Sequence, residues 1–315
     1  MEEIFINVIA DTHFTNTIPQ SRKDNYPETI RQKYRSIFEL YPCHYNIFAG
    51  DVFHKSVLPL KYINSMAELE VETRKIDGHQ TYVVPGNHDA SFADLSYLNQ
   101  SALGNWIETQ LVKKLDRLTI SIGSVEVDIL GWDYSEKLPK KRDNVYTIMI
   151  GHAFYENSVV KEKELVITAS EIREEGYDMV VLGHDHAKYL PCTIPGTNCI
   201  LYRPGGFSRG TSNHYNVWKE IAILRIALAC INGKFVVNAD YVTVPSLSPE
   251  EVFLEEARNK RQTEFKKTLQ DFVLKVRGTT LQSGEVYEVL DSLEIETDVK
   301  RYVENLLTSY GIVRI

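Results

Sequence analysis

Short apolar runs alternate with helical patterns along the first third of the chain. Residues 4–10 form an almost unbroken apolar run, which is typical of a strand covered on both faces. Further strands are predicted at 45–49 and 80–84, with helical periodicity at 30–40 and 59–76 between them. This strand–helix–strand order predicts a layered α/β sheet whose loops gather at the strand ends.

The middle of the chain is rich in predicted strands joined by short turns. One helix is predicted at 169–175, and the predicted strands are 118–122, 125–132, 145–150, 179–182 and 200–203. Residues 220–227 and 234–244 form a predicted hairpin, because the Asn232-Gly233 pair between them is a strong turn sequence. We expect this hairpin to close a second sheet. The economical arrangement of two such halves is a four-layered α-β-β-α sandwich.

A break at 245–249 predicts a change of domain. Ser248, Pro249 and Glu251 supply an N-cap serine, an N1 proline and an N3 glutamate, which together predict the start of a helix. That helix is expected to run to about Val276, before a connector at 278–284. An apolar stripe at helical spacing then includes Val299, Tyr302, Val303, Leu306, Leu307 and Tyr310. We therefore predict a main domain at 1–245 and a small, mainly helical, cap-like unit at 246–315.

The composition is that of an ordinary soluble globular protein, with 43% hydrophobic and 25% charged residues. The net charge of −8 argues mildly against a large electrostatic footprint on nucleic acid, although bound divalent cations would add positive charge where a phosphate sits. The four cysteines form no C-x-x-C pair, which favours free thiols over a Cys192–Cys199 disulfide. The sequence has no signal-peptide pattern and no apolar run near the ~20 residues of a membrane span, so we expect a cytoplasmic protein.

Metal-ligating side chains follow five of the predicted strands. The five strings are Asp11-Thr12-His13, Gly50-Asp51, Gly86-Asn87-His88-Asp89, Gly151-His152 and Gly183-His184-Asp185-His186. One string alone is better explained by a buried core histidine or a capping aspartate. Together with His54, however, the strings account for six of the nine histidines, and scattered core histidines would not follow apolar runs so regularly. The set therefore predicts one composite metal site.

The spacing of the ligands predicts two neighbouring cations. Side chains two apart in a strand face the same side, so Asp11 and His13 can hold one ion together. We assign Asp11, His13, His186 and Asp51 to one cation, and Asp51, Asn87, His152 and His184 to the other, with Asp51 as the bridge. Two cations ~3.5–4 Å apart suit the attack of water on phosphorus. Nitrogen and oxygen ligands without a thiolate favour manganese, iron or zinc over copper or an iron–sulfur cluster, with magnesium as a further candidate.

Two further histidines are candidates for catalysis. His88 is expected to face the substrate, with Asp89 holding it in its protonated, donating form. His54 lies three residues after Asp51 and could act on the scissile phosphate as acid or base. The alternative is a loop histidine that only supports Asp51.

The five strings resemble the motifs of the calcineurin-like metallophosphoesterase superfamily, in the family's order, over residues 11–186. The resemblance implies a two-metal phosphoesterase with an α-β-β-α sandwich, often manganese-dependent, with the ligand roles assigned above. In the family, the histidine at the position of His88 contacts the phosphate and assists the leaving group.

Residues 50–59, Gly-Asp-Val-Phe-His-Lys-Ser-Val-Leu-Pro, are similar to the second motif of SbcD-type DNA-repair exonucleases. In that branch a histidine at the position of His54 assists phosphodiester cleavage. The later string Pro-Gly-Gly-Phe-Ser at 204–208 departs slightly from the Pro-Gly-Ser-like or Gly-Thr/Ser-Pro string that is usual in that branch.

The SbcD-type resemblance implies a metal-dependent exo/endonuclease that cleaves DNA in repair or recombination, with an SbcC-type coiled-coil ATPase as partner. Formation of a homodimer is left open. The first alternative is a phosphatase or small-nucleotide phosphodiesterase of the same superfamily, which the acidic net charge favours. The second alternative is a non-catalytic scaffold, which the complete set of ligands disfavours.

Several side chains are candidates for contacts with DNA, and for each the alternative is an ordinary structural role. Arg203 and Arg209 follow the last motif and could bind phosphates. The other basic candidates are Lys137, Lys140, Lys141, Arg142, Arg22 and Lys23, although such loops are usually solvated turns. Aromatic rings beside the motifs could stack on bases. These are Phe14, Phe53, Phe154 and Tyr155, of which Phe53 and Phe154 are expected to pack inside the protein instead.

Overall fold

The computed structural model describes residues 3–134, 137–158, 164–211, 217, 219–257, 259, 287, 290, 300, 303, 304 and 307. Contacts between residues divide the chain into two compact units. The first consists of residues 1–18, 27–208 and 220–246, and the second of 19–26, 209–219 and 247–315. The second unit thus combines the predicted C-terminal region with two short earlier segments. The functions expected of the two predicted domains stay predictions.

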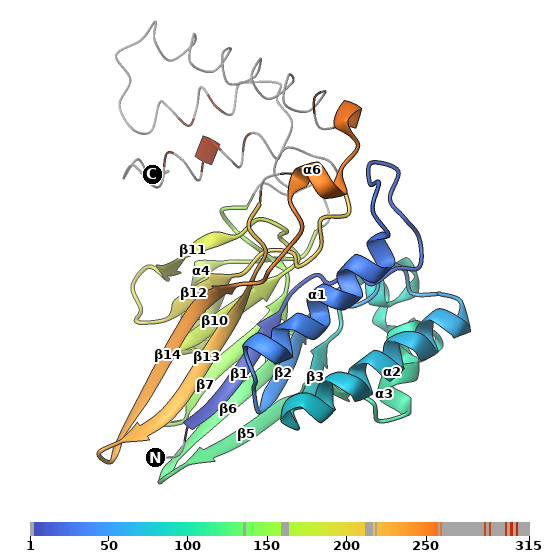
Figure 1. Ribbon diagram of the computed structural model, residues 1–315. Coiled ribbons are helices and arrows are strands. Elements are labelled where there is room, and N and C mark those ends of the chain that lie inside the picture. Colours follow the sequence, from blue (N-terminus) through green and yellow to red (C-terminus); the bar gives the residue numbers. More distant parts are fainter. Residues whose placement is uncertain are drawn as a thin grey trace, which may run out of the picture. The chain divides into compact units, whose positions relative to one another are not determined.

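The first sheet has the strand order β14-β13-β1-β2-β3-β4 (Figure 1). Its strands are β1 (Glu3–Ile9), β2 (Tyr45–Ala49), β3 (Gln80–Val84), β4 (Lys113–Lys114), β13 (Ala222–Ile231) and β14 (Lys234–Thr243). Strands β1 to β4 are parallel, and β13 is antiparallel to β1. The predicted β13–β14 hairpin is confirmed, since Asn232 and Gly233 both have positive φ (52° and 74°), as its tight turn requires.

The prediction that this hairpin closes the second sheet is wrong. β13 pairs with the free edge of β1, with Ile6 opposite Ile226. Both residues are fully buried in the same core, so the hairpin extends the apolar face that β1 begins. Local turn sequence predicted the hairpin, but it contains no information about which sheet edge the hairpin joins.

The second sheet has the strand order β11-β12-β10-β7-β6-β5. Its strands are β5 (Arg117–Ile122), β6 (Val125–Trp132), β7 (Tyr146–His152), β10 (Met179–Gly183), β11 (Tyr189–Thr193) and β12 (Ile200–Arg203). The four central strands are parallel, whereas the edge strands β5 and β11 are antiparallel to their neighbours. Strands β8 (Phe154–Tyr155) and β9 (Val166–Ile167) form a separate two-stranded ribbon, and its Tyr155 and Ile167 share a core with the second sheet.

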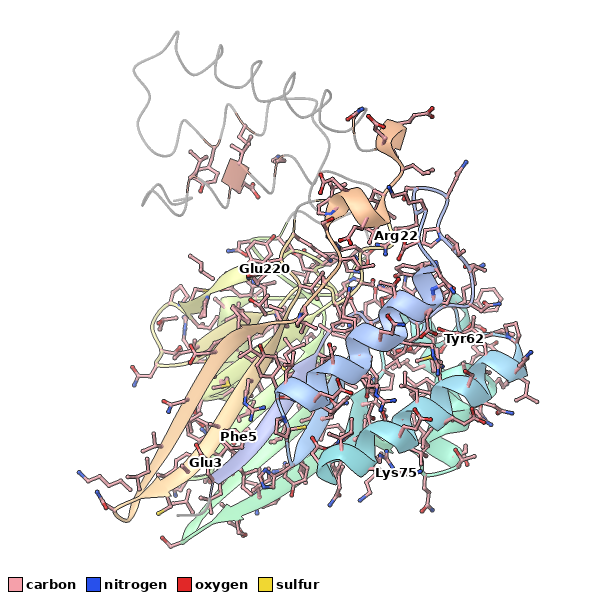
Figure 2. All side chains as sticks on the ribbon, viewed as in Figure 1. Glu3, Phe5, Arg22, Tyr62, Lys75 and Glu220 are labelled. Carbon is pink, nitrogen blue, oxygen red and sulfur yellow. The ribbon has the colours of Figure 1, made fainter. Side chains whose placement is uncertain are left out.

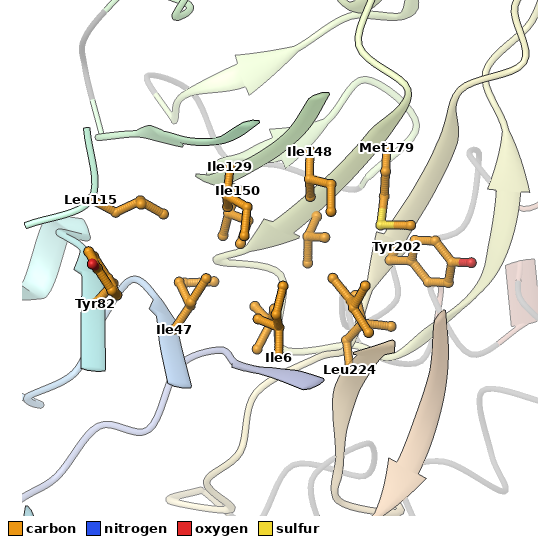
Figure 3. Close-up of a cluster of buried hydrophobic side chains, with 14 of the residues drawn as sticks. Ile6, Ile47, Tyr82, Leu115, Ile129, Ile148, Ile150, Met179, Tyr202 and Leu224 are labelled. Atoms are coloured by element: carbon orange, nitrogen blue, oxygen red, sulfur yellow. The ribbon is translucent and has the colours of Figure 1, made fainter. Parts of the chain in front are cut away.

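The two sheets pack face to face through one hydrophobic core (Figure 3). Ile6 and Ile47 of the first sheet lie opposite Ile148 and Ile150 of the second, and all four are fully buried. Burial of each such side chain contributes roughly 1.5–3 kcal/mol. This core fixes the sheets against each other, so the loops at their strand ends keep a defined separation.

Helices cover the outer faces of both sheets. Helices α1 (Tyr26–Leu40) and α2 (Leu60–Asp77) lie on the first sheet (Figure 1), and the exposed side of α2 carries charged residues such as Lys75 (Figure 2). On the second sheet, Ile172 of α4 (Ala169–Glu175) packs in a second core with Met149, Val180 and Leu182. The predicted four-layered α-β-β-α sandwich is therefore confirmed.

The segment between β3 and β4 contains helical turns that the sequence pattern did not predict. They are η1 (Asn87–Asp89), η2 (Ser91–Ala93), η3 (Leu95–Gln100) and α3 (Ala102–Glu108). Trp106 of α3 is buried and meets Phe53 edge-on, with ring centroids 4.9 Å apart. Short turns of this kind are set by side-chain caps, such as Ser101 on Gly104, more than by apolar periodicity.

In the second unit, Ser248 caps the predicted helix start, and Glu251 completes the capping box. The helix α6 (Pro249–Val252) is much shorter than expected, because Phe253 has an extended backbone with φ −103° and ψ 145°. The prediction of a continuous helix from Pro249 is therefore wrong. Of its expected continuation to Val276, residues 255–257 and 259 are helical, whereas 258, 260–276 and the connector at 278–284 lie outside the described residues. Two residues of the 299–310 stripe are described, namely Val303, which is buried, and Leu307, which is partly buried.

The four cysteines are free thiols, as expected, and Cys43 and Cys199 are buried. Within the described residues, helices that combine the length and the apolar character needed to cross a bilayer are absent.

Candidate metal centre

The five ligand-bearing strings meet at one edge of the sandwich. They follow β1, β2 and β3 of the first sheet and lie at the carboxyl ends of β7 and β10 of the second. Within each sheet these strands are parallel, so their carboxyl ends lie on the same side. Ligands in such loops converge at the strand ends, which is where open α/β sheets commonly bind their ligands.

Asp11, His13 and His186 form the first group of ligands, with one ligand atom of each within 4.8 Å of the others. The Nε2 atoms of His13 and His186 are 3.0 Å apart, and His186 Nε2 lies 3.5 Å from Asp11 Oδ1. These are three of the four ligands that the sequence assigned to the first cation, and Asp51 is the fourth.

Asp51, His152 and His184 form the second group, again within 4.8 Å. His152 Nε2 lies 3.4 Å from Asp51 Oδ1 and 3.2 Å from Asn87 Oδ1. The other carboxylate oxygen, Asp51 Oδ2, lies 3.7 Å from His13 Nε2 of the first group. Asp51 therefore turns one oxygen to each group, as a bridging carboxylate must.

Four of these ligands have a left-handed backbone, although none is glycine. The φ values are 51° for Asp11, 45° for His13, 49° for Asp51 and 85° for His184. Asp11 and His13 were expected to face the same side as residues two apart in a strand. This prediction is wrong, because β1 ends at Ile9 and both residues lie beyond it. Tight turns after the strands bring the ligands together instead. Such backbone conformations are strained and are found most often at functional sites.

Glycines next to the ligands leave room for them. A Cβ on Gly50 would lie 1.9 Å from His152 Nδ1, and a Cβ on Gly86 would lie 2.3 Å from Asp51 Oδ1. Both distances are far shorter than a real Cβ contact. The glycines of the motifs are thus required by the close approach of Asp51 and His152 to the neighbouring backbone.

The charges of the centre fit divalent cations. Asp11 and Asp51 are buried, and histidines are their only ion-pair partners among the described residues. Burial opposes ionisation of Asp51, but the charge and hydrogen bond of His152 hold its pKa well below the usual range. Burial lowers the pKa of His152, but Asp51 outweighs it and raises that pKa to about 9. Two buried carboxylates without lysine or arginine need compensating charge, which cations held by these nitrogen and oxygen ligands would supply.

Hydrogen bonds orient the imidazoles of the second group. His152 Nδ1 lies 2.9 Å from the Ala49 carbonyl oxygen, so Nδ1–H donates there and Nε2 is the atom that faces Asp51 and Asn87. His184 Nε2 lies 3.0 Å from Glu164 Oε2, which also accepts a bond from Tyr134 Oη at 3.2 Å. Bonds of this kind fix the tautomer of a metal-binding histidine. The sequence did not predict Glu164 as a site residue, because Glu164 has no regular spacing to any of the five motifs.

His88 and His54 lie beside the first group of ligands. The ring centroid of His88 is 5.0 Å from that of His13, and the rings of His88 and His54 are 5.6 Å apart. Both side chains are exposed, and His88 Nδ1 lies 2.9 Å from the His54 carbonyl oxygen. Two candidate acid–base groups thus face solvent next to the ligands, as a phosphate-contacting role requires.

The expected role of Asp89 in holding His88 is wrong. Its carboxylate accepts hydrogen bonds from the backbone N–H groups of Gly86 (2.9 Å), Phe53 (3.1 Å) and Val52 (3.3 Å). Asp89 is fully buried, and it ties the loop of Asp51 to the turn that carries Asn87. The His54 carbonyl orients His88 in its place.

The expected phosphate contacts of Arg203 and Arg209 are also contradicted. Both side chains are only 4% exposed. Arg203 donates to Asn157 Oδ1 at 2.9 Å and lies over the Tyr189 ring, 3.6 Å from its centroid. Arg209 donates to backbone carbonyl oxygens within the second unit. Neither guanidinium group is free to bind substrate.

Four of the six basic loop candidates form ion pairs within the protein. Lys140, Lys141 and Arg142 pair with Glu175, Asp178 and Asp128, respectively. Arg22 is 6% exposed and forms an ion pair with Asp24 at 2.7 Å.

All four aromatic candidates make contacts within the protein, which contradicts the expected base stacking of Phe14 and Tyr155. Phe14 and Phe53 are fully buried and Tyr155 is 5% exposed, so none of them can stack on a base. Phe154 is partly exposed but packs edge-on against the His184 ring, 4.3 Å between centroids.

A groove of about 610 Å³ opens beside His54 and His88. It is lined by two loops, namely His54, Lys55, Ser56 and Val57 after β2, and Asn87, His88, Ala90, Ser91, Phe92 and Ala93 after β3. None of these described lining residues is a carboxylate, so an anionic substrate meets no acidic side chain on its walls.

Comparison with known proteins supports this interpretation of the site. Residues 6–188 match the family model of the calcineurin-like phosphoesterases. Comparison with curated proteins returns no match.

Solved structures with similarity to the chain include two from Thermus thermophilus. One is a 5'-nucleotidase precursor (TM-score 0.42, 10% identity, 86% of this chain and 60% of that chain covered). The other is TT1561 (TM-score 0.43, 10% identity, 75% and 99% covered). A third is Vacuolar Protein Sorting 29 from Cryptosporidium parvum (TM-score 0.35, 14% identity, 76% and 98% covered). The chain thus spans 60% of the length of the nucleotidase precursor.

The family match covers more than half of the chain, and all seven ligand residues, from Asp11 to His186, fall inside it. The family hydrolyses phosphoesters with divalent metal ions, which agrees with the two ligand groups that share Asp51. The chain belongs to the calcineurin-like phosphoesterase family.

Proposed function

We propose that the protein is a two-metal phosphodiesterase that cleaves DNA, as an SbcD-like exo/endonuclease. Asp51 carries the proposal, because its two oxygens lie 3.4 Å and 3.7 Å from imidazole nitrogens of two different ligand groups. A carboxylate in this position can bridge two cations. When bound, the two cations would lower the pKa of a water molecule and stabilise charge on the phosphoryl oxygens.

The remaining work falls to residues of the chain. Protonated His88 would donate Nδ1–H to the His54 carbonyl oxygen, 2.9 Å away, and present Nε2–H to a phosphoryl or leaving oxygen. The ring of His54 lies nearly parallel to that of His88, at an interplanar angle of 23°, and can supply a second donor to the same phosphate. Asn87 and His152 contact each other within the second ligand group. The Asp89 carboxylate accepts a hydrogen bond from the backbone of Phe53 and so joins the loop after β3 to the loop after β2.

Two observations support a diester of DNA as the substrate. The first is the SbcD-like string at 50–59, which places His54 beside His88 at the groove. The second is the groove itself, which is open to solvent and lined by Lys55 and two histidines with no carboxylate. An open groove with one lysine and no carboxylate suits a strand that continues beyond the cleaved bond.

A small-nucleotide phosphodiesterase or phosphatase is the second candidate. The specific observation in its favour is that Arg203, Arg142 and Lys141 are used in contacts within the protein. Few of the cations expected to follow a long DNA backbone are therefore available near the site. The net charge of −8 points in the same direction.

The deciding experiment compares substrates under one condition. The purified full chain is incubated with manganese and, separately, labelled duplex DNA, a labelled single strand, bis(p-nitrophenyl) phosphate and p-nitrophenyl phosphate. We expect DNA and the diester to be cleaved, and Asp51→Ala to remove both activities. Hydrolysis of the aryl esters without any DNA cleavage, also after addition of an SbcC-type ATPase, would favour the second candidate.

The proposal includes manganese as the ion, an SbcC-type ATPase as partner and the cytoplasm as the compartment. The nitrogen and oxygen ligands support manganese, and the four free thiols support a reducing compartment. Metal analysis of the protein purified without added metal would test the first of these. Copurification with an ATPase would test the second.

A further inference from the structure

Phe92 has an unusual position next to the metal centre. Its side chain is 92% exposed, the largest value among the bulky hydrophobic residues that the structure describes. Its backbone is left-handed, with φ 58° and ψ 19°, and the next residue, Ala93, has φ 56°. Two consecutive left-handed residues other than glycine are strained. A strained turn that holds a phenyl ring in water is unfavourable for folding alone, which indicates a function for the ring.

Neighbouring residues fix this turn. Ser91 Oγ lies 3.1 Å from Ser56 Oγ, which joins the two loops that line the groove. The backbone N–H of Asp94 donates to the carbonyl oxygen of Ser91 at 3.1 Å. The ring of Phe92 meets that of Tyr97 edge to face, with centroids 6.0 Å apart and an interplanar angle of 72°. Because a T-shaped contact covers at most one face of a ring, at least one face of Phe92 stays open.

The ring lines the same groove as His54 and His88. Phe92 follows His88 by four residues on one short loop, and Lys55 lies on the opposite loop. An open aromatic face, an ammonium group and two imidazoles on one groove of about 610 Å³ match the base, the backbone phosphate and the scissile phosphate of a nucleotide.

We propose that Phe92 is the stacking platform of a nucleobase subsite beside the metal centre. The base belongs to the nucleotide whose phosphate contacts His88, and Lys55 faces its backbone. Since every base has a π face, this subsite selects nucleotides over sugar phosphates without strong preference among the bases. The inference rests on the proposed phosphodiesterase function and adds the recognition of the base.

The test uses two dinucleotides with the same sugars and the same phosphodiester, one with its bases and one abasic at both positions. The measured quantity is the ratio of kcat/KM for the base-bearing dinucleotide to that for the abasic one, with the full chain and manganese. We expect Phe92→Ala to lower this ratio roughly tenfold, mainly through KM, because aromatic stacking of one base is of that size. Phe92→Tyr should restore it.

Leu190→Ala is the matched control, because it removes another exposed apolar side chain (75% exposed), on the edge strand β11, which contributes no residue to the groove. Its ratio should equal that of the wild type. Equal loss on both dinucleotides, or no loss at all, in Phe92→Ala would overturn the subsite.

A second measurement separates this inference from the proposed function. Thymidine 5'-phosphate and deoxyribose 5-phosphate are compared as inhibitors of bis(p-nitrophenyl) phosphate hydrolysis. If the wild type cleaves the aryl diester but neither dinucleotide, the proposed DNA function is wrong. The subsite would still be supported if thymidine 5'-phosphate inhibits more tightly than deoxyribose 5-phosphate and Phe92→Ala removes that difference. Equal inhibition by the two compounds would reject it.

Discussion

Gly50 lies so close to the ring of His152 that a methyl group does not fit between them. A Cβ at position 50 would lie 1.9 Å from His152 Nδ1 and 2.2 Å from Cγ. His152 cannot move outward, because it is fully buried and its Nδ1 is bonded to the Ala49 carbonyl oxygen at 2.9 Å. We therefore predict that Gly50→Ala displaces this ring from Asp51 and Asn87. The substitution removes no ligand, yet it should impair the second ligand group.

The magnitude has two parts. Gly50 has φ 86°, so alanine there costs about 1–2 kcal/mol for the left-handed backbone alone. Displacement of His152 adds a loss of metal affinity, which we expect to exceed the roughly 10–100-fold loss that follows removal of an orienting residue around a metal ligand. Gly78 supplies the matched control, because it has a similar φ of 77° and nothing within 4 Å of an added Cβ. Gly78→Ala should cost the same backbone strain and leave metal binding intact.

The assay is manganese titration by calorimetry, combined with thermal unfolding and hydrolysis of bis(p-nitrophenyl) phosphate. We expect two tight ions in the wild type and in Gly78→Ala, but one in Gly50→Ala, together with loss of turnover. Both variants should melt a few degrees lower, at about 2–4 °C per kcal/mol. Two tight ions and normal turnover in Gly50→Ala would refute the reasoning that glycine is needed to seat His152.

Three further sets of variants test other parts of the molecule. Asp51→Ala should abolish turnover and strip metal, whereas His88→Ala should abolish turnover with the metal retained; unchanged metal stoichiometry in Asp51→Ala would contradict the bridge. Glu164→Ala should weaken manganese binding roughly 10–100-fold, with partial recovery in Glu164→Gln, and an unaltered titration would show that Glu164 does not orient His184. Glu70→Ala should lower the free energy of unfolding by roughly 3–5 kcal/mol, since fully buried Glu70 accepts from Tyr34 Oη at 2.7 Å and from Arg74 Nε at 3.1 Å. Burial opposes its ionisation, but these and other hydrogen bonds lower the pKa of Glu70, so its contribution is full above about pH 4.3 and is lost as the pH falls through the lowered pKa. Urea unfolding of the wild type and of Glu70→Gln should therefore converge in acid, and an equal difference at pH 7 and pH 3 would argue against this ionised network.

The sequence predicted the strands and the ligands because both depend on short-range information. Strand β2 and strand β3 have the predicted bounds, since a buried strand is a local apolar run. The ligand residues were found because each follows such a run, and parallel strands end on the same side of a sheet. No contact over a long distance had to be known for this step.

Features that depend on the packing of separate segments were not accessible from the sequence. The hairpin of β13 and β14 joined the first sheet because the edge of β1 was available. Glu164 reaches His184 only through the fold, twenty residues apart in sequence. The burial of Arg203 and Phe14 follows from tertiary contacts. Residue type alone does not distinguish an arginine or a phenylalanine in a core from one that lines a groove.

The metal centre is a consequence of how the two sheets pack. Asp11, His13, Asp51 and Asn87 follow strands of the first sheet. His152 ends β7 of the second sheet, and His184 and His186 follow β10. Each ligand group takes residues from both sheets, so bound ions link the sheets at one edge while the core of Ile6, Ile47, Ile148 and Ile150 holds them along their length. The left-handed turns at four of the ligands are strained, and they persist because the surrounding core fixes the strands on which they stand. The same strain explains why the motifs place glycine beside the ligands: the ligand needs a rigid, crowded turn, and glycine is the residue that leaves space for it.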